Sequence, residues 1–131
     1  MRTLNLLISP LSQTPIYEQI KMQIKELVLS GKLKSGEQLP SIRLMAKDLQ
    51  VGIITVKRAY DDLFADGITI SLPGRGVFVA YIDQERVKQI HLDMLSERLL
   101  EIKTFCDSTS ISKEELQQRI NNIYGGNNNG K

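Results

Sequence analysis

The fold of this chain is decided by residues 41–79, which read SIRLMAKDLQVGIITVKRAYDDLFADGITISLPGRGVFV. Ser41 supplies an N-cap, and apolar residues recur at helical spacing through Gln50, so a helix is predicted there. The pair Val51-Gly52 forms a short break before a second helical period that ends at Gly67. Two helices joined by a turn of a few residues are typical of a helix-turn-helix.

The period changes beyond that second helix. Ile68, Ile70 and Leu72 alternate with polar residues, which predicts an extended strand. A turn at residues 73–76 and a second extended run at residues 77–79 complete a two-stranded hairpin.

An earlier helix precedes the decisive stretch. Its apolar residues follow a 3.6-residue period from Ile16 to Val28, with Thr14 as the expected N-cap and Pro15 as the first helical residue. The chain is therefore predicted to be mainly α with a small β wing: a winged helix-turn-helix, assigned to residues 1–81 with its core at about 10–81.

Helical patterning returns after the hairpin. Apolar residues recur there at alternating spacings of three and four and form a seam along one helix face: Leu92, Leu95, Leu99, Ile102 and Cys106. Such a seam needs a partner helix, which predicts dimerisation. Ser112 and Glu115 have the spacing of a capping box for a final helix. This short two-helix region is assigned to residues 82–124, and residues 125–131 are expected to be a disordered tail.

Composition favours a cytoplasmic binding protein over an enzyme. Among 131 residues, positions 1–81 hold 10 Lys and Arg against 7 Asp and Glu, so a polyanion is expected to meet the first part of the chain. The sequence shows no secretion signal or membrane span, and its single cysteine forms no intramolecular disulfide.

We expect no catalytic residues, no metal and no cofactor. His91 and Cys106 are better explained by packing than by catalysis, and a redox-sensing role for Cys106 is the less favoured alternative.

The second helix of the motif has an outward face with DNA-binding chemistry. A helical wheel buries Val56 and its periodic neighbours and exposes Ile54, Lys57 and Arg58. An isoleucine there suits a thymine methyl group, and the basic residues suit bases or phosphates. Two alternatives stay open: Ile53 and Ile54 both pack into the turn, or the basic residues are only surface charges.

Two flanking features extend this candidate surface. Arg43 lies in the first turn of the helix expected to cross the DNA backbone, where it would contact phosphate. The wing tip, Gly74, Arg75 and Gly76, combines a free backbone with an outward guanidinium, which suits phosphate or minor-groove contact. The alternatives are a solvated or internally paired Arg43 and a plain tight hairpin.

Five stretches follow one another in the chain: PIYEQI (15–20), GKL (31–33), GEQLPSIR (36–43), TVKRAY (55–60) and GRGVFV (74–79). Together they resemble the DNA-binding domain of the GntR family of bacterial transcriptional regulators over about residues 10–81. The resemblance is specific because several linked motifs occur in order.

That resemblance assigns roles to individual positions. It implies that Arg43 holds a phosphate and that Thr55 and Lys57 read or flank bases. It also implies that the glycine-rich wing enters the minor groove with Arg75. The partner is accordingly double-stranded DNA.

Three positions depart from the family pattern. Members often carry Ser or Thr where Gly52 stands and a basic residue where Ile53 stands, so we expect an operator unlike the commoner ones. Phe64 replaces a frequent acidic residue, which predicts an exposed aromatic side chain without an assigned role.

The remaining part of the chain, about 50 residues, is too short for the family's larger ligand-binding domains and resembles the YtrA-like subfamily. That resemblance implies a dimerisation region and a gene associated with an ABC transporter. We therefore predict a homodimeric, sequence-specific repressor on a roughly palindromic operator. The alternative is a winged-helix protein-interaction module without specific DNA binding, and an enzyme is a distant third. A small-molecule effector is left open.

Overall fold

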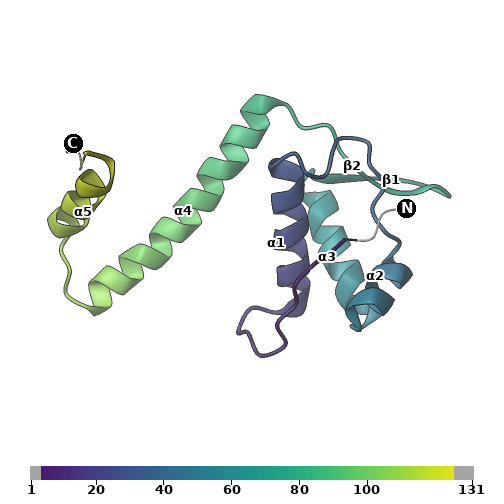
Figure 1. Cartoon of the computed structure of the whole chain (residues 1–131), viewed down its shortest axis with the longest axis horizontal. Helices are drawn as coiled ribbons and strands as arrows, with labels where there is room; N and C mark the ends of the chain where they lie inside the picture. The colour runs from purple at the N-terminus through teal and green to yellow at the C-terminus, as the bar shows by residue number, and fades with distance from the viewer. Residues whose placement is uncertain (1–3, 126–131) are drawn as a thin grey trace. The chain divides into compact units, whose positions relative to one another are not determined.

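The computed structural model describes residues 4–125, which fall into two compact units, one ending at Gln84 and the other beginning at Glu85. The first unit consists of α1 (Ile16–Leu29), α2 (Ile42–Leu49), α3 (Ile53–Ala65), β1 (Thr69–Leu72) and β2 (Gly76–Val79) (Figure 1). The second is built from α4 (Gln84–Ser108) and α5 (Lys113–Gly125). The predicted fold, mainly helical with a small β wing, is confirmed. No helix within residues 4–125 has the length and apolar composition needed to cross a bilayer.

Helix α3 is the centre of the first unit, and it packs against α1, α2 and β1. Its buried face meets the apolar stripe of α1, in which Ile20 and Ile24 are fully buried. Ion pairs flank this packing: Lys21 Nζ lies 3.9 Å from Asp62 Oδ2, and Lys25 Nζ lies 3.3 Å from Asp66 Oδ2. The orientation of α3 is thus fixed by apolar burial and by charges along one edge.

The start of α1 differs by one residue from the prediction. Pro15 has an extended ψ of 150° and occupies the N-cap position, so the helix begins at Ile16. The carbonyl of Thr14 accepts a hydrogen bond from Gln19 Nε2 at 2.8 Å. Thr14 is therefore held outside the helix.

An extended N-terminal segment lies along α1 and was not predicted. The Gln23 amide bonds both backbone groups of Leu7: its Nε2 donates to the carbonyl at 2.7 Å, and its Oε1 accepts from the N–H at 2.8 Å. One turn earlier, the Gln19 amide makes the same pair of bonds to Ser9, at 2.9 and 2.8 Å. Leu4 and Leu6 are buried in this arrangement, which we call the glutamine ladder.

The turn between α2 and α3 is short and well bonded. Ser41 caps α2 as predicted, its Oγ accepting from the Leu44 N–H at 3.1 Å. The helix ends at Gln50, whose φ of 57° is left-handed and lets the Val51 N–H bond the Ala46 carbonyl at 3.0 Å. Helix α3 then begins directly after Gly52, which provides no side-chain cap.

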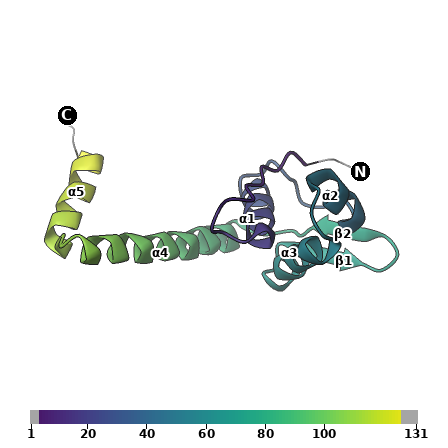
Figure 2. The same ribbon diagram turned by 90° about the horizontal axis from the view of Figure 1, so that it is seen from below.

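The wing is an antiparallel hairpin in which Thr69 pairs with Val79 and Leu72 with Gly76. The segment before α2 runs as a third extended stretch along β2. The Val79 N–H donates to the Glu37 carbonyl at 2.8 Å, and the Leu39 N–H donates to the Val77 carbonyl at 2.9 Å. The hairpin projects beyond the helices of its unit (Figure 2). This extra pairing joins its base to the start of α2.

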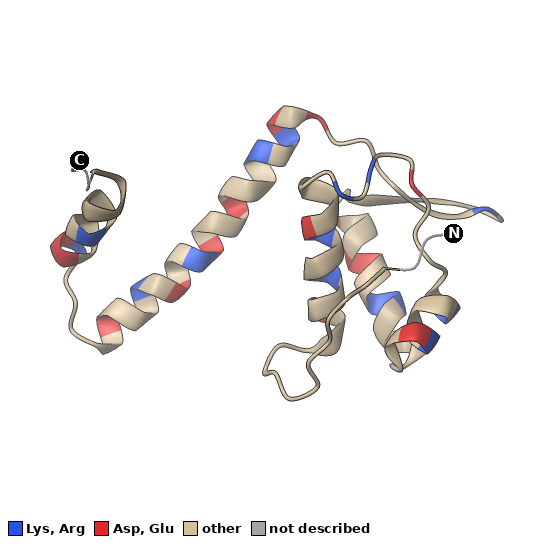
Figure 3. Ribbon diagram, in the orientation of Figure 1, with Lys and Arg blue, Asp and Glu red and all other residues tan. Residues whose placement is uncertain are grey.

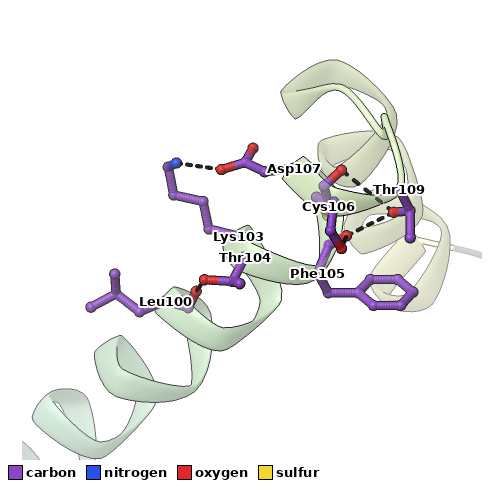
Figure 4. A network of polar contacts seen from close by, with 8 residues as sticks. Leu100, Lys103, Thr104, Phe105, Cys106, Asp107 and Thr109 are labelled. Atoms are coloured by element: carbon purple, nitrogen blue, oxygen red, sulfur yellow. Dashed lines mark hydrogen bonds and ion pairs between the residues drawn. The ribbon is translucent and has the colours of Figure 1, made fainter.

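In the second unit, α4 ends in a compact turn. Thr109 Oγ1 donates to the Phe105 carbonyl at 2.7 Å, and Lys103 Nζ pairs with Asp107 Oδ2 at 2.7 Å (Figure 4). Ser110 has a left-handed φ of 61° and redirects the chain toward α5.

Helix α5 opens with the predicted capping box. The Glu115 N–H donates to Ser112 Oγ at 3.1 Å, and the Ser112 N–H donates to Glu115 Oε1 at 2.9 Å. These bonds lower the pKa of the Glu115 carboxyl. The helix includes Gly125, the first residue of the expected tail, and residues 126–131 lie outside the described part of the chain.

Candidate DNA-binding surface

Helix α3 presents two chemically different faces. Its buried face consists of Val56, Ala59, Tyr60 and Leu63, as the helical period predicts. The opposite face carries Ile54, Lys57, Arg58 and Asp61, all exposed. Thr55 lies between the two faces and is half-buried. The outward face is thus solvent-exposed from Ile54 to Asp61.

The two isoleucines at the start of α3 differ in exposure. Ile54 is 83% exposed and does not pack into the turn, whereas Ile53 is 48% exposed and is about half covered. The tight left-handed ending of α2 at Gln50 leaves room for only two residues before α3 begins. The buried face therefore starts only at Val56.

The basic residues of α3 are held by specific neighbours. Lys57 Nζ lies 2.8 Å from Asp61 Oδ2, one turn along the same exposed face. Arg58 Cζ lies 3.8 Å from the centre of the Tyr17 ring in α1, a cation–π contact. Both basic residues are visible in the sequence as candidates, but the role of Tyr17 is not, because only the fold brings α1 beside this part of α3.

A buried hydrogen bond joins α3 to the segment before α2. The Tyr60 hydroxyl donates to the Pro40 carbonyl at 2.7 Å. Burial raises the pKa of the Tyr60 hydroxyl, which therefore stays protonated and able to donate. Arg43, in the first turn of α2, is exposed. The bond thus fixes α3 relative to the helix that carries Arg43.

The wing tip is supported from outside the hairpin. Gly74 and Gly76 have φ values of 74° and 126°, which favour glycine, and Arg75 between them is exposed. Gln38 Nε2 donates to the Arg75 carbonyl at 2.9 Å, and a Cβ at Gly76 would come within 2.6 Å of that same nitrogen. Gln38 lies inside a motif quoted above, but a contact 37 positions away leaves no local sequence signal.

Charge is unevenly distributed over the first unit. Basic residues lie on α2, on α3 and at the tip of the hairpin (Figure 3). In contrast, Lys21 of α1 is engaged with Asp62 of α3, and Lys25 with Asp66 at the C-cap of α3. The candidate contacts Arg43, Lys57, Arg58 and Arg75 therefore belong to a set of exposed cations that also includes Lys32, Lys34 and Lys47.

The predicted dimerisation seam is incompletely covered within one chain. Leu92, Leu95, Leu99 and Ile102 are each 40–50% exposed, whereas Cys106, at the end of the seam, is a buried free thiol. Phe64 is exposed, as expected for an aromatic residue without a packing role. No group of three or more His, Cys, Asp or Glu within the described residues is arranged to hold a metal ion.

Comparisons with known proteins agree with this geometry. The family model described as "Bacterial regulatory proteins, gntR family" matches residues 16–79. The HTH-type transcriptional repressor YtrA of Bacillus subtilis (strain 168) is 35% identical over 124 residues, or 95% of each chain. A crystal structure of a transcriptional antiterminator from Listeria monocytogenes EGD-e aligns with a TM-score of 0.71 and 30% identity, covering 92% of this chain and 90% of that one. The structure of AraR(DBD) in complex with operator ORX1 aligns with a TM-score of 0.53 and 30% identity, covering 61% and 100%.

Proposed function

Because this chain belongs to the gntR family of bacterial regulatory proteins, it is a DNA-binding transcriptional regulator, and we propose that it is a homodimeric repressor acting on a roughly palindromic operator. The first unit, about residues 1–81, binds DNA, and the helices of residues 82–124 dimerise. Repression follows from occupancy: a dimer on its operator blocks access to the promoter.

The outward face of α3 is the observation that carries this proposal. Its exposed side chains combine apolar and basic groups, while the opposite face is buried against α1 and α2. In a helix-turn-helix, the second helix enters the major groove with its N-terminal residues at the base edges. We assign base contacts to Ile54, Thr55 and Lys57. Arg58 then contacts a base or a phosphate.

Phosphate and minor-groove contacts complete the docking. Arg43 in α2 binds a phosphate where this helix crosses the backbone. The tip formed by Gly74, Arg75 and Gly76 enters the minor groove, with Gln38 supporting its backbone from below. An Arg in a narrow minor groove is favoured by the negative potential there.

The seam on α4 supports dimerisation. Apolar side chains at coiled-coil spacing that stay 40–50% exposed in one chain are available to a second copy. A twofold dimer presents two α3 helices about one DNA turn apart, roughly 34–36 Å, and therefore prefers a palindromic site.

Three further assignments follow from the family. The chain acts in the bacterial cytoplasm, where its operator lies, and the relatives described above are regulators, which argues against an enzyme. Control of a transporter operon rests on the resemblance to the YtrA-like subfamily. The function as proposed requires no metal or cofactor.

Fluorescence anisotropy tests the proposal. Labelled duplex DNA from upstream of the protein's own gene is titrated with the purified full-length protein at two salt concentrations. A shuffled duplex serves as the competitor. We expect a dissociation constant of about 10 nM or tighter and resistance to the shuffled competitor. Affinity should fall steeply with salt, because each phosphate contact contributes about −0.9 to the slope of log K against log salt. Equal competition by the shuffled duplex would refute operator recognition.

Arg43→Ala tests the docking. This variant should weaken binding to operator and shuffled DNA alike and make the salt slope shallower by about 1.8, because one phosphate contact is lost from each subunit of the dimer. Lys88→Ala, which removes one exposed cation from the second unit, is the matched control and should leave both quantities unchanged. Operator binding by Arg43→Ala that equals wild type would show that α2 does not cross the DNA backbone as proposed.

A further inference from the structure

The start of α3 is apolar where a DNA-binding helix usually places polar side chains. Ile53 and Ile54 are its first two residues, 48% and 83% exposed, and we call them the isoleucine pair. We propose that the isoleucine pair recognises the C5-methyl groups of thymines in the major groove, so that each operator half-site must present thymine opposite it. This inference rests on the proposed function, because it requires α3 to lie in the major groove.

Base-edge chemistry identifies the occupant. In the major groove the thymine methyl is the apolar group that a base pair offers, while the other edges offer hydrogen-bond donors and acceptors. An isoleucine side chain has no polar atom and forms no hydrogen bond with such donors or acceptors. Burying it against a guanine or adenine edge would leave those groups unsatisfied, which is costly. The pair therefore selects thymine both by attraction and by penalising other bases.

Local geometry leaves the pair accessible. Gly52 precedes it without a side chain, and a Cβ built there would meet only the Thr55 hydroxyl within 4 Å, at 3.8 Å. The chain enters α3 from a left-handed residue, Gln50, so the two side chains follow directly on a tight turn. The first turn of α3 is thus free to approach a groove floor closely.

The charges around the pair argue for DNA rather than an apolar protein partner. Lys57 and Arg58 are exposed on the next turn of α3, and Arg43 is exposed on α2. An apolar partner would bury these cations without compensation, whereas phosphates pair with them. The isoleucine pair is thus an apolar patch surrounded by basic residues. The major groove offers the complementary arrangement, in which a thymine methyl group lies between two phosphate backbones.

Uracil substitution tests the proposal, because deoxyuridine differs from thymidine only by the C5-methyl group. The operator is the duplex that the full-length protein enriches from a random-sequence pool. Each thymine of a half-site is replaced singly by uracil, and affinity is measured by competition anisotropy. We expect one or two thymines per half-site at which the loss of the methyl weakens binding about 4-fold, equivalent to ~0.8 kcal/mol at 1.4 kcal/mol per tenfold. Uracil at the remaining thymines should change affinity by less than about 1.5-fold.

Protein variants assign the effect to the pair. In Ile53→Ala or Ile54→Ala, the uracil penalty at the facing thymine should fall to about 1-fold, since the contact is already gone. Lys57→Ala is the matched control, because it should weaken thymine and uracil duplexes equally. Ile53→Val and Ile54→Val, which each remove one methylene, replace an alanine variant that fails to fold. They should reduce the uracil penalty partially.

Two results would overturn the proposal. One is that the wild-type protein binds its enriched duplex equally well when uracil replaces each thymine. The same result is expected if the isoleucine pair binds a protein partner and not DNA. The other is a penalty that persists unchanged in both isoleucine variants. Failure to enrich any duplex would instead refute DNA recognition itself, so the two hypotheses fail in different ways.

Discussion

Tyr60→Phe removes one oxygen atom from the core of the first unit, and its cost follows from the structure. The Tyr60 hydroxyl is buried and donates to the Pro40 carbonyl at 2.7 Å. Pro40 is also fully buried, so its carbonyl would lose this donor with no water to replace it. Leaving a buried acceptor unsatisfied costs about 1–3 kcal/mol. For a domain of this size, each kcal/mol lowers Tm by roughly 4–8 °C.

The assay is urea and thermal unfolding of the full chain followed by circular dichroism, with Tyr81→Phe as the matched control. Tyr81 is 80% exposed, so its hydroxyl is satisfied by water and the control should match wild type. We expect Tyr60→Phe to lower Tm by at least about 4 °C. The slope of unfolding free energy against urea should stay the same, because the exposed surface hardly changes.

The pH dependence of this difference provides a second test. Burial raises the pKa of Tyr60 in the folded protein above the unfolded value of about 10. A raised folded pKa gives stability that is complete below pH 10 and is lost as pH rises, because the unfolded state then releases a proton that the folded state keeps. The advantage of wild type over Tyr60→Phe should therefore shrink by about 1 kcal/mol between pH 8 and pH 10.5. Equal stability of the two proteins at pH 8, or a gap that widens with pH, would refute the buried hydrogen bond.

Four other predictions concern the caps, the wing and the seam. Ser41→Ala should lower the free energy of unfolding by about 1 kcal/mol through loss of the α2 cap, measured by urea titration. Gly76→Ala should weaken operator binding at unchanged salt slope, because its φ of 126° and the nearby Gln38 nitrogen oppose a Cβ; an unaltered affinity would contradict the wing's role. Leu99→Asn should produce monomers in sedimentation velocity, whereas Leu100→Asn, which lies off the seam, should remain dimeric. The pKa of Glu115 is lowered in the folded protein, so its contribution to α5 is present at pH values above the ordinary carboxyl pKa of about 4.3. The helicity of α5 should therefore decline as the pH falls below that value, and Glu115→Gln should abolish the decline.

Local patterns in the sequence predicted most of the fold. The 3.6-residue period of α3 separated Val56 from Lys57 correctly, because burial in a helix depends only on angular position. Ser41 and Ser112 were identified as caps for the same reason: a cap bonds an N–H three residues away. Such interactions are confined to one turn and are therefore visible in a single sequence.

Contacts between distant segments could not be predicted. The Arg58–Tyr17 stacking and the Gln38–Arg75 bond join residues that only the assembled fold brings together. How far Ile53 is exposed could not be decided from the sequence either, because it depends on how tightly α2 ends. Hydrophobicity alone does not distinguish an isoleucine that packs from one that is free to bind.

The glutamine ladder sets where a DNA-binding fragment of this protein has to begin. The family match starts at residue 16, yet Gln19 and Gln23 bond the backbone of residues 7 and 9. A fragment cut at residue 16 would leave both amides to water and would strip away the buried Leu4 and Leu6. It would be prone to self-association through the newly opened apolar surface. A fragment that begins at or before Leu4 keeps the ladder, and an affinity tag placed ahead of it leaves α1 undisturbed.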